Sequence, residues 1–145
     1  MKVLLFLIIS WFHVTPVQSE APKDAMVILN AWIETQNKGT DEAISSFIKT
    51  YYAPEVLNKM KNFDDHLKFY RQVIDEFGPI QKVIFEEMES TETKLKVQLL
   101  KQGTPLVPTP EPEEILVVEI DLDAQNPKFI EKGLGMGALI CYIKR

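Results

Sequence analysis

The sequence contains few residues that could build a metal site or a covalent cross-link. It has one cysteine, Cys141, and two histidines, His13 and His66. A single thiol forms no internal disulfide, so the hydrophobic core has to hold the fold alone. A structural zinc site needs four ligands, and calcium needs closely spaced oxygen ligands that the acidic runs lack. We therefore expect no metal site and no cofactor.

Motifs for nucleophilic catalysis and for phosphate binding are also missing. No Gly-x-Ser-x-Gly occurs, and Ser45 and Ser46 lie on an expected helix with no base nearby. Glycines alternate over residues 133–137, but no Lys-Ser/Thr pair follows them as in a phosphate loop. We interpret these glycines as a cause of strand curvature. The sequence thus argues against a serine hydrolase and against a nucleotide-binding enzyme.

Positive charge is scarce as well. The sequence has 16 Lys and Arg residues against 21 Asp and Glu residues, and its formal net charge is −5. Binding to nucleic acid or to anionic lipid needs a concentrated basic surface, because phosphate contacts supply much of the affinity. Scattered lysines in an acidic chain do not form such a surface, so we expect no nucleic-acid partner.

The first residues have the pattern of a signal peptide. The apolar run Val3–Phe12 is about half as long as the ~20 residues that a membrane span requires. Val17 and Ser19 fit the positions before a cleavage site. We expect a signal peptide over residues 1–19 and a single exported domain over residues 20–145, periplasmic or extracellular, with no stable membrane anchor after cleavage. The alternative is that the apolar run stays on the chain as an anchor.

Apolar residues recur at helical spacing in the first half of the mature chain. Helices are expected over residues 25–38, 40–51, 54–60 and 62–77, with Asn62 or Asp64 as the cap of the last one. Gly78 and Pro79 stop that helix, because glycine accepts a left-handed conformation and proline cannot continue a helix. Trp32, Phe47 and Phe77 recur on the apolar stripes and are expected to anchor the core.

Strand patterns fill the second half of the chain. Strands are expected over residues 81–88, 93–100, 114–122 and 129–143, the last as one strand or a strand pair. Glycines within residues 129–143 predict a bulge, a bend or a hairpin corner there. Residues 102–112 contain four prolines and are expected to form an extended surface loop.

Helices followed by sequential strands predict an α+β fold, in which N-terminal helices pack on a curved antiparallel sheet. Four segments of the chain have motifs of a known superfamily: residues 31–41, 47–55, 77–79 and 126–130. Through these motifs the chain resembles the nuclear transport factor 2-like superfamily. Its members have a cone-shaped (cystatin-like) fold and include ketosteroid isomerases and polyketide cyclases. More narrowly, residues 41–55 and 77–79 are similar to small domains fused to bacterial secreted serine hydrolases. The shared motifs are packing and turn motifs over nearly all of the mature chain.

The resemblance to ketosteroid isomerase raises the question of acid–base catalysis. That enzyme uses a carboxylate base beside an oxyanion site that contains a tyrosine. In this chain Glu119 is the candidate base and Tyr70 or Tyr51 the candidate hydrogen-bond donor, while His66 shares a helical face with Tyr70. None of these positions matches a catalytic residue of the superfamily, so the resemblance assigns them no role.

Glu119 has two alternative environments. It interrupts an otherwise apolar strand. On the concave face of the sheet it would be a half-buried carboxylate with a raised pKa. On the other face it would pair across the sheet with Lys94 or Lys96.

Two classes of function follow. The first is an exported, non-catalytic binding or accessory module that holds a small apolar ligand or docks a protein partner, such as the hydrolase that the resemblance implies. The second is a small isomerase-, cyclase- or dehydratase-like enzyme that uses a pocket carboxylate and a tyrosine. A filled apolar cone favours the first class, and a tyrosine–carboxylate pair in a roomy pocket favours the second. A homodimer formed through the sheet is a further expected partner.

The signal-peptide pattern gives a direct prediction. We expect the exported protein to begin at Glu20, because cleavage after Ser19 fits the small-residue positions. The intact mass of the exported protein measures this. A mass that still includes residues 1–19 would contradict it.

Overall fold

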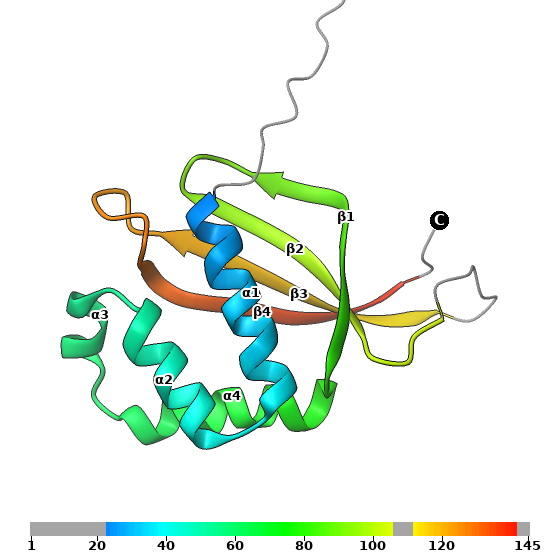
Figure 1. Cartoon of the computed structure of the whole chain (residues 1–145), viewed down its shortest axis with the longest axis horizontal. Coiled ribbons are helices and arrows are strands. Elements are labelled where there is room, and N and C mark those ends of the chain that lie inside the picture. The colour runs from blue at the N-terminus through cyan, green and yellow to red at the C-terminus, as the bar shows by residue number, and fades with distance from the viewer. Residues whose placement is uncertain (1–22, 106–111, 142–145) are drawn as a thin grey trace, which may run out of the picture.

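The computed structural model describes residues 23–105 and 112–141, so the expected signal peptide and most of the Pro-rich loop lie outside the described residues. Four helices precede four strands (Figure 1). They are α1 (Lys23–Lys38), α2 (Asp41–Tyr51), α3 (Pro54–Lys59), α4 (Phe63–Phe77), β1 (Ile80–Ser90), β2 (Lys94–Lys101), β3 (Glu113–Leu122) and β4 (Ile130–Cys141). Within the described ranges, no helix is long and apolar enough to cross a membrane.

The four strands form one antiparallel sheet in the order β1-β2-β3-β4. The sheet curves around α1, and the other helices lie together below it (Figure 1). This is the expected α+β architecture. Successive side chains of a strand point to opposite faces of the sheet. On the buried face, Val97 of β2 lies opposite Val118 of β3.

Aromatic side chains fill the space between the helices and the sheet. Trp32 is fully buried, and its ring centre lies 5.3 Å from that of Phe47 and 4.9 Å from that of Tyr70. Phe77 is buried as well. The prediction that Trp32, Phe47 and Phe77 anchor the core is confirmed.

The helix boundaries follow the capping signals of the sequence. The backbone N–H of Ala43 donates a hydrogen bond to Thr40 Oγ1 at the start of α2. Asn62, rather than Asp64, caps α4, because its side-chain oxygen accepts from the Asp64 N–H. Gly78 closes α4 with φ 77°, a conformation that favours glycine.

Two amide side chains of α1 hold the junction between α4 and β1. Gln36 Nε2 donates to the Gly78 carbonyl at 2.8 Å. Asn37 Nδ2 donates to the Ile80 carbonyl at 3.1 Å, and Asn37 Oδ1 accepts from the Ile80 N–H at 2.7 Å. Asn37 therefore pairs with Ile80 as a neighbouring strand would, and it fixes where β1 begins.

The glycine-rich end of the chain is one strand with a bulge rather than a strand pair. Ile120 pairs with Leu134, but Leu122 pairs with Ile130, so two extra residues of β4 lie between these pairs. Gly133 lies in this interval and has φ 105°. The bulge is therefore placed where a residue without Cβ relieves the strain.

Phe47→Ala should destabilise the protein strongly. The ring is buried against Trp32, and truncation of such an aromatic leaves a cavity that costs about 3–5 kcal/mol. Val27→Ala is the control, because Val27 is 56% exposed on α1 and its loss should cost less than about 0.5 kcal/mol. Denaturant unfolding of both variants measures the difference, and equal stabilities would contradict the assignment of Phe47 to the core.

Candidate functional site

The structure brings two tyrosines together at the centre of the fold. Tyr70 of α4 is buried, and its hydroxyl is hydrogen-bonded to the hydroxyl of Tyr52, which follows the end of α2. The sequence predicts a role for Tyr70 but gives no prediction for Tyr52. Tyr51 is only partly buried and packs on Phe47, with ring centres 5.2 Å apart. The candidate tyrosine site therefore consists of Tyr52 and Tyr70, and Tyr51 belongs to the helical packing.

Tyr52 also completes the hydrogen bonding of the β4 bulge. The Leu134 N–H donates to Tyr52 Oη at 3.3 Å. The Ala53 N–H donates to the Ile130 carbonyl at 3.1 Å, and Tyr52 forms a parallel bridge with Ile130. A Cβ atom on Gly133 would lie 3.3 Å from Tyr52 Oη. The tyrosine therefore fits against the bulge and joins the end of α2 to the start of β4.

One of the two hydroxyl protons of the tyrosine pair is not used in these hydrogen bonds. Tyr52 Oη accepts from Leu134, and only one of the two hydroxyls donates to the other. The second hydroxyl proton has no acceptor within the described part of the chain. Burial raises the pKa of Tyr52 and raises that of Tyr70 further, with the neighbouring Tyr52 adding to the effect. Both groups therefore stay protonated at neutral pH.

His66 lies beside the tyrosine pair, as its position four residues before Tyr70 predicts. Its ring centre is 6.2 Å from that of Tyr52 and 6.5 Å from that of Tyr70, with edge-on geometry in both cases. His66 also lines a wide cavity beside α3. Of the sequence candidates, the structure therefore brings His66 and Tyr70 together, with Tyr52 as the third ring of the group.

Glu119 is not part of this group. Its carboxylate lies 2.7 Å from Lys94 Nζ on the face of the sheet opposite to the buried Val118 and Ile120. Lys94 Nζ also lies 3.9 Å from the carboxylate of Asp121. This is the paired, outward arrangement, the second of the two alternatives for Glu119. Glu119 is therefore not placed to act as a base for the tyrosine pair.

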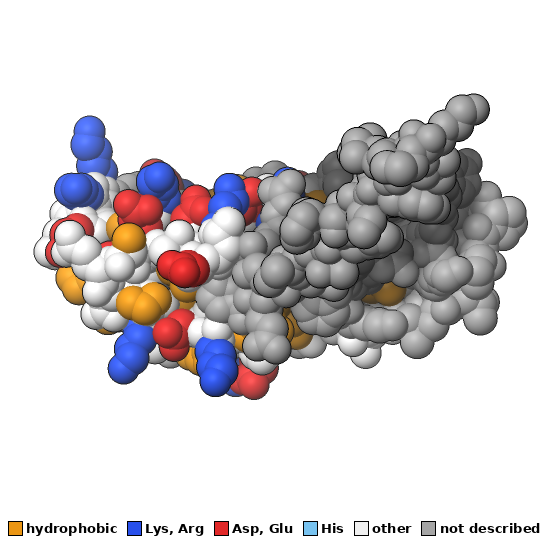
Figure 2. All heavy atoms as spheres, turned by 90° about the horizontal axis from the view of Figure 1, so that it is seen from above, with side chains coloured by type: hydrophobic (Ala, Val, Ile, Leu, Met, Phe, Trp, Pro, Cys, Tyr) orange, Lys and Arg blue, Asp and Glu red, His pale blue; other side chains and the backbone are white. Residues whose placement is uncertain are grey.

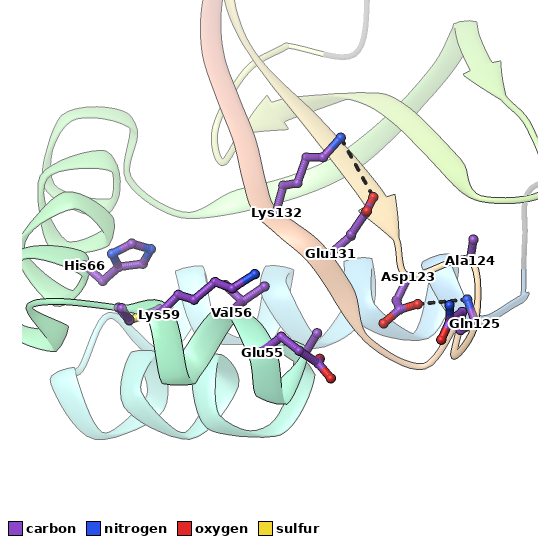
Figure 3. A pocket seen from close by; sticks show the side chains of 11 residues that line it. Glu55, Val56, Lys59, His66, Asp123, Ala124, Gln125, Glu131 and Lys132 are labelled. Carbon is purple, nitrogen blue, oxygen red and sulfur yellow. Dashed lines mark hydrogen bonds and ion pairs between the residues drawn. The ribbon is translucent and has the colours of Figure 1, made fainter.

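The cavity lined by His66 has a volume of about 790 Å³ and opens between α3, the start of α4 and the turn from β3 to β4 (Figure 3). Charged groups of both signs line it, including Glu55, Lys59 and Glu131. Asp123 is engaged in its own turn, where its carboxylate accepts from the backbone N–H of Gln125 at 2.8 Å. The cavity is a wide, charged hollow, and the residues that line it include no serine or cysteine nucleophile.

A second hollow is mostly apolar. It has a volume of about 220 Å³ and lies between α4 and the sheet, and we call it the α4 groove. Its lining residues are Phe69, Gln72, Val73, Glu76 and Phe77 of α4, Glu114 and Leu116 of β3, and Met136 and Gly137 of β4. Phe69 of this lining is 46% exposed, whereas Phe77 is buried. The groove thus presents apolar side chains beside an incompletely buried phenylalanine.

The position of Phe69 in the sequence could have indicated this groove, although the helical pattern alone does not single it out. Phe69 lies outside the apolar stripe of α4, which runs through Leu67, Tyr70, Val73, Ile74 and Phe77. A large apolar residue beside such a stripe widens it beyond what the core covers. Tyr52 gave no comparable signal, because its role depends on a bulge about 80 residues later in the chain.

Within the described ranges, no group of three or more His, Cys, Asp or Glu side chains is placed to hold a metal ion. Comparisons of this chain with protein-family models, with curated proteins and with solved structures found no match. The fold and the site geometry therefore define it as an α+β protein with a curved antiparallel sheet, a buried tyrosine pair and an apolar groove.

The two tyrosines should respond differently to loss of their hydroxyl groups. Tyr52→Phe removes the acceptor of the Leu134 N–H and the partner of Tyr70, so we expect a loss of about 1–3 kcal/mol. Tyr70→Phe removes one hydrogen bond but leaves Leu134 its acceptor, and it should cost less. Denaturant unfolding compares the two variants. A larger loss for Tyr70→Phe would contradict the assigned hydrogen bonds.

Proposed function

We propose that this chain is an exported, non-catalytic binding module that holds a small apolar group in the α4 groove. The observation that carries the proposal is the groove itself, where Phe69, Val73 and Met136 present apolar surface that the core leaves uncovered. Burial of such surface by a ligand is favourable by roughly 25 cal/mol for each Å² removed from water. A cavity of about 150 Å³ accepts benzene, so a groove of about 220 Å³ accommodates a one- or two-ring group.

The arrangement of the candidate residues supports binding over catalysis. Acid–base catalysis needs a group whose pKa lies near the working pH. The raised pKa values of the buried tyrosines keep them protonated, which suits a hydrogen-bond donor but leaves the role of base to another group. Glu119 pairs with Lys94 instead of facing the tyrosines. The space between helices and sheet is filled by side chains such as Trp32 and Phe47, which is the filled cone expected of a binding module.

The resemblance to the nuclear transport factor 2-like superfamily adds a proposed context. Domains of this kind that are fused to secreted hydrolases imply an accessory role beside an enzyme, and a homodimer through the sheet remains a second proposed partner. On the face shown in Figure 2, acidic and basic side chains are interspersed over the coloured part. Such mixed charge supports a protein or small-molecule partner rather than nucleic acid.

Phe69→Ser should weaken binding of an uncharged apolar probe such as naphthylethanol. We expect about a fivefold loss of affinity, because the substitution removes roughly 40 Å² of apolar contact. Fluorescence titration of the probe measures the dissociation constant. The fold should be retained, since the Phe69 side chain is nearly half exposed and is not part of the buried core.

Val27→Ser is the matched control for this experiment. Val27 and Phe69 are the two large hydrophobic residues that are exposed in the described part of the chain, and Val27 lies outside the groove. Binding by the control variant should equal that of the unchanged protein. The proposal fails if no apolar probe binds, or if both substitutions weaken binding equally.

A further inference from the structure

We propose that the ligand of the α4 groove is a small apolar amine, bound as its ammonium cation. This inference rests on the proposed function, since it names the class of ligand that the same groove takes. It is carried by the charges around an otherwise apolar site.

Both charged residues that the described structure places in the groove are acidic. Glu76 comes from the last turn of α4, and Glu114 comes from the start of β3, so the two carboxylates belong to different elements that both border the apolar lining. Among the described residues, no Lys or Arg forms an ion pair with either carboxylate. Glu76 accepts one hydrogen bond, from Gln72 Nε2 at 2.7 Å, and this donor carries no charge.

The backbone of α4 adds negative potential at the same place. The groove includes Phe77, the last residue of α4, and carbonyl groups at the end of a helix carry partial negative charge. Helices commonly place a basic residue in the last turn to balance this charge, but α4 has none there and carries Asp75 and Glu76 instead. Lys101 passes close to Gly78 but is not among the groove residues. A cation bound in the groove would supply the missing positive charge.

The lining also determines how such a ligand would lie. Phe69, Val73 and Met136 offer no hydrogen-bond partners suited to a polar body, so the ring or alkyl part of the ligand contacts them. The ammonium group then stays in solvent contact near Glu76 and Glu114, which avoids the cost of a fully desolvated charge. Each exposed ion pair contributes only modestly, so we expect the amine to bind about tenfold more tightly than a neutral analogue of the same shape.

The test compares three probes with the same naphthalene body: naphthylethylamine, naphthylethanol and naphthylacetate. The amine should bind most tightly and the carboxylate most weakly, as measured by fluorescence titration at low salt. The advantage of the amine over the alcohol should shrink towards unity in 1 M salt, where charges are screened within about 3 Å.

Substitution of the two carboxylates isolates the charge effect. In the double variant Glu76→Gln and Glu114→Gln, affinity for the amine should fall to that for the alcohol, and affinity for the alcohol should not change. Glutamine keeps the size of the side chain and its acceptor oxygen for Gln72. Glu92→Gln is the control, because Glu92 is exposed in the turn between β1 and β2 and is not a groove residue; it should leave all three affinities unchanged.

The outcomes separate this inference from the proposed function. If the amine and the alcohol bind equally, or if the double variant keeps the preference for the amine, the assignment of a cationic ligand is overturned while the apolar binding site stands. If none of the three probes binds, the proposed function fails and the inference fails with it.

Discussion

Two amide side chains of α1 hold the backbone where α4 turns into β1, and the layout of the fold depends on this contact. Gln36 fixes the Gly78 carbonyl, and Asn37 pairs with both polar groups of the Ile80 backbone. A helix end and a strand start leave such groups without partners in their own element. Because both amide side chains come from α1, the first helix fixes the point at which the end of α4 meets the start of β1.

The same contact explains why the first element of the chain lies inside the curve of the sheet. Trp32 is one turn before Gln36 on α1 and packs against Phe47 and Tyr70. Apolar contacts therefore hold the middle of α1, and directional hydrogen bonds hold its end. The first kind of contact supplies most of the stabilisation, and the second fixes a single register between helix and sheet.

Local patterns predicted the fold well, because helices and strands bury residues at fixed periods. The spacing of Trp32 and Phe47 on their stripes identified the core, and Gly78 marked the end of α4. The orientation of β3 was harder to predict from the sequence. A period of two shows that the side chains of Glu119 and Val118 point to opposite faces of the sheet, but it does not show which face is concave. The tyrosine pair was out of reach for another reason: Tyr52 meets its partner Leu134 only because β4 contains a bulge, and no local pattern encodes a contact over that distance.

The join between Tyr52 and β4 also bears on how the protein behaves at high concentration. β4 is an edge strand, and an edge with free N–H and C=O groups is a template for pairing with another molecule. Here the segment Tyr52–Ala53 occupies the start of that edge, and the bulge at Gly133 interrupts the regular spacing that an added strand would need. The contact between Tyr52 and the β4 bulge therefore also disfavours strand-to-strand aggregation at this end of the sheet. This matters for a chain with a single cysteine, because no internal disulfide stabilises its fold.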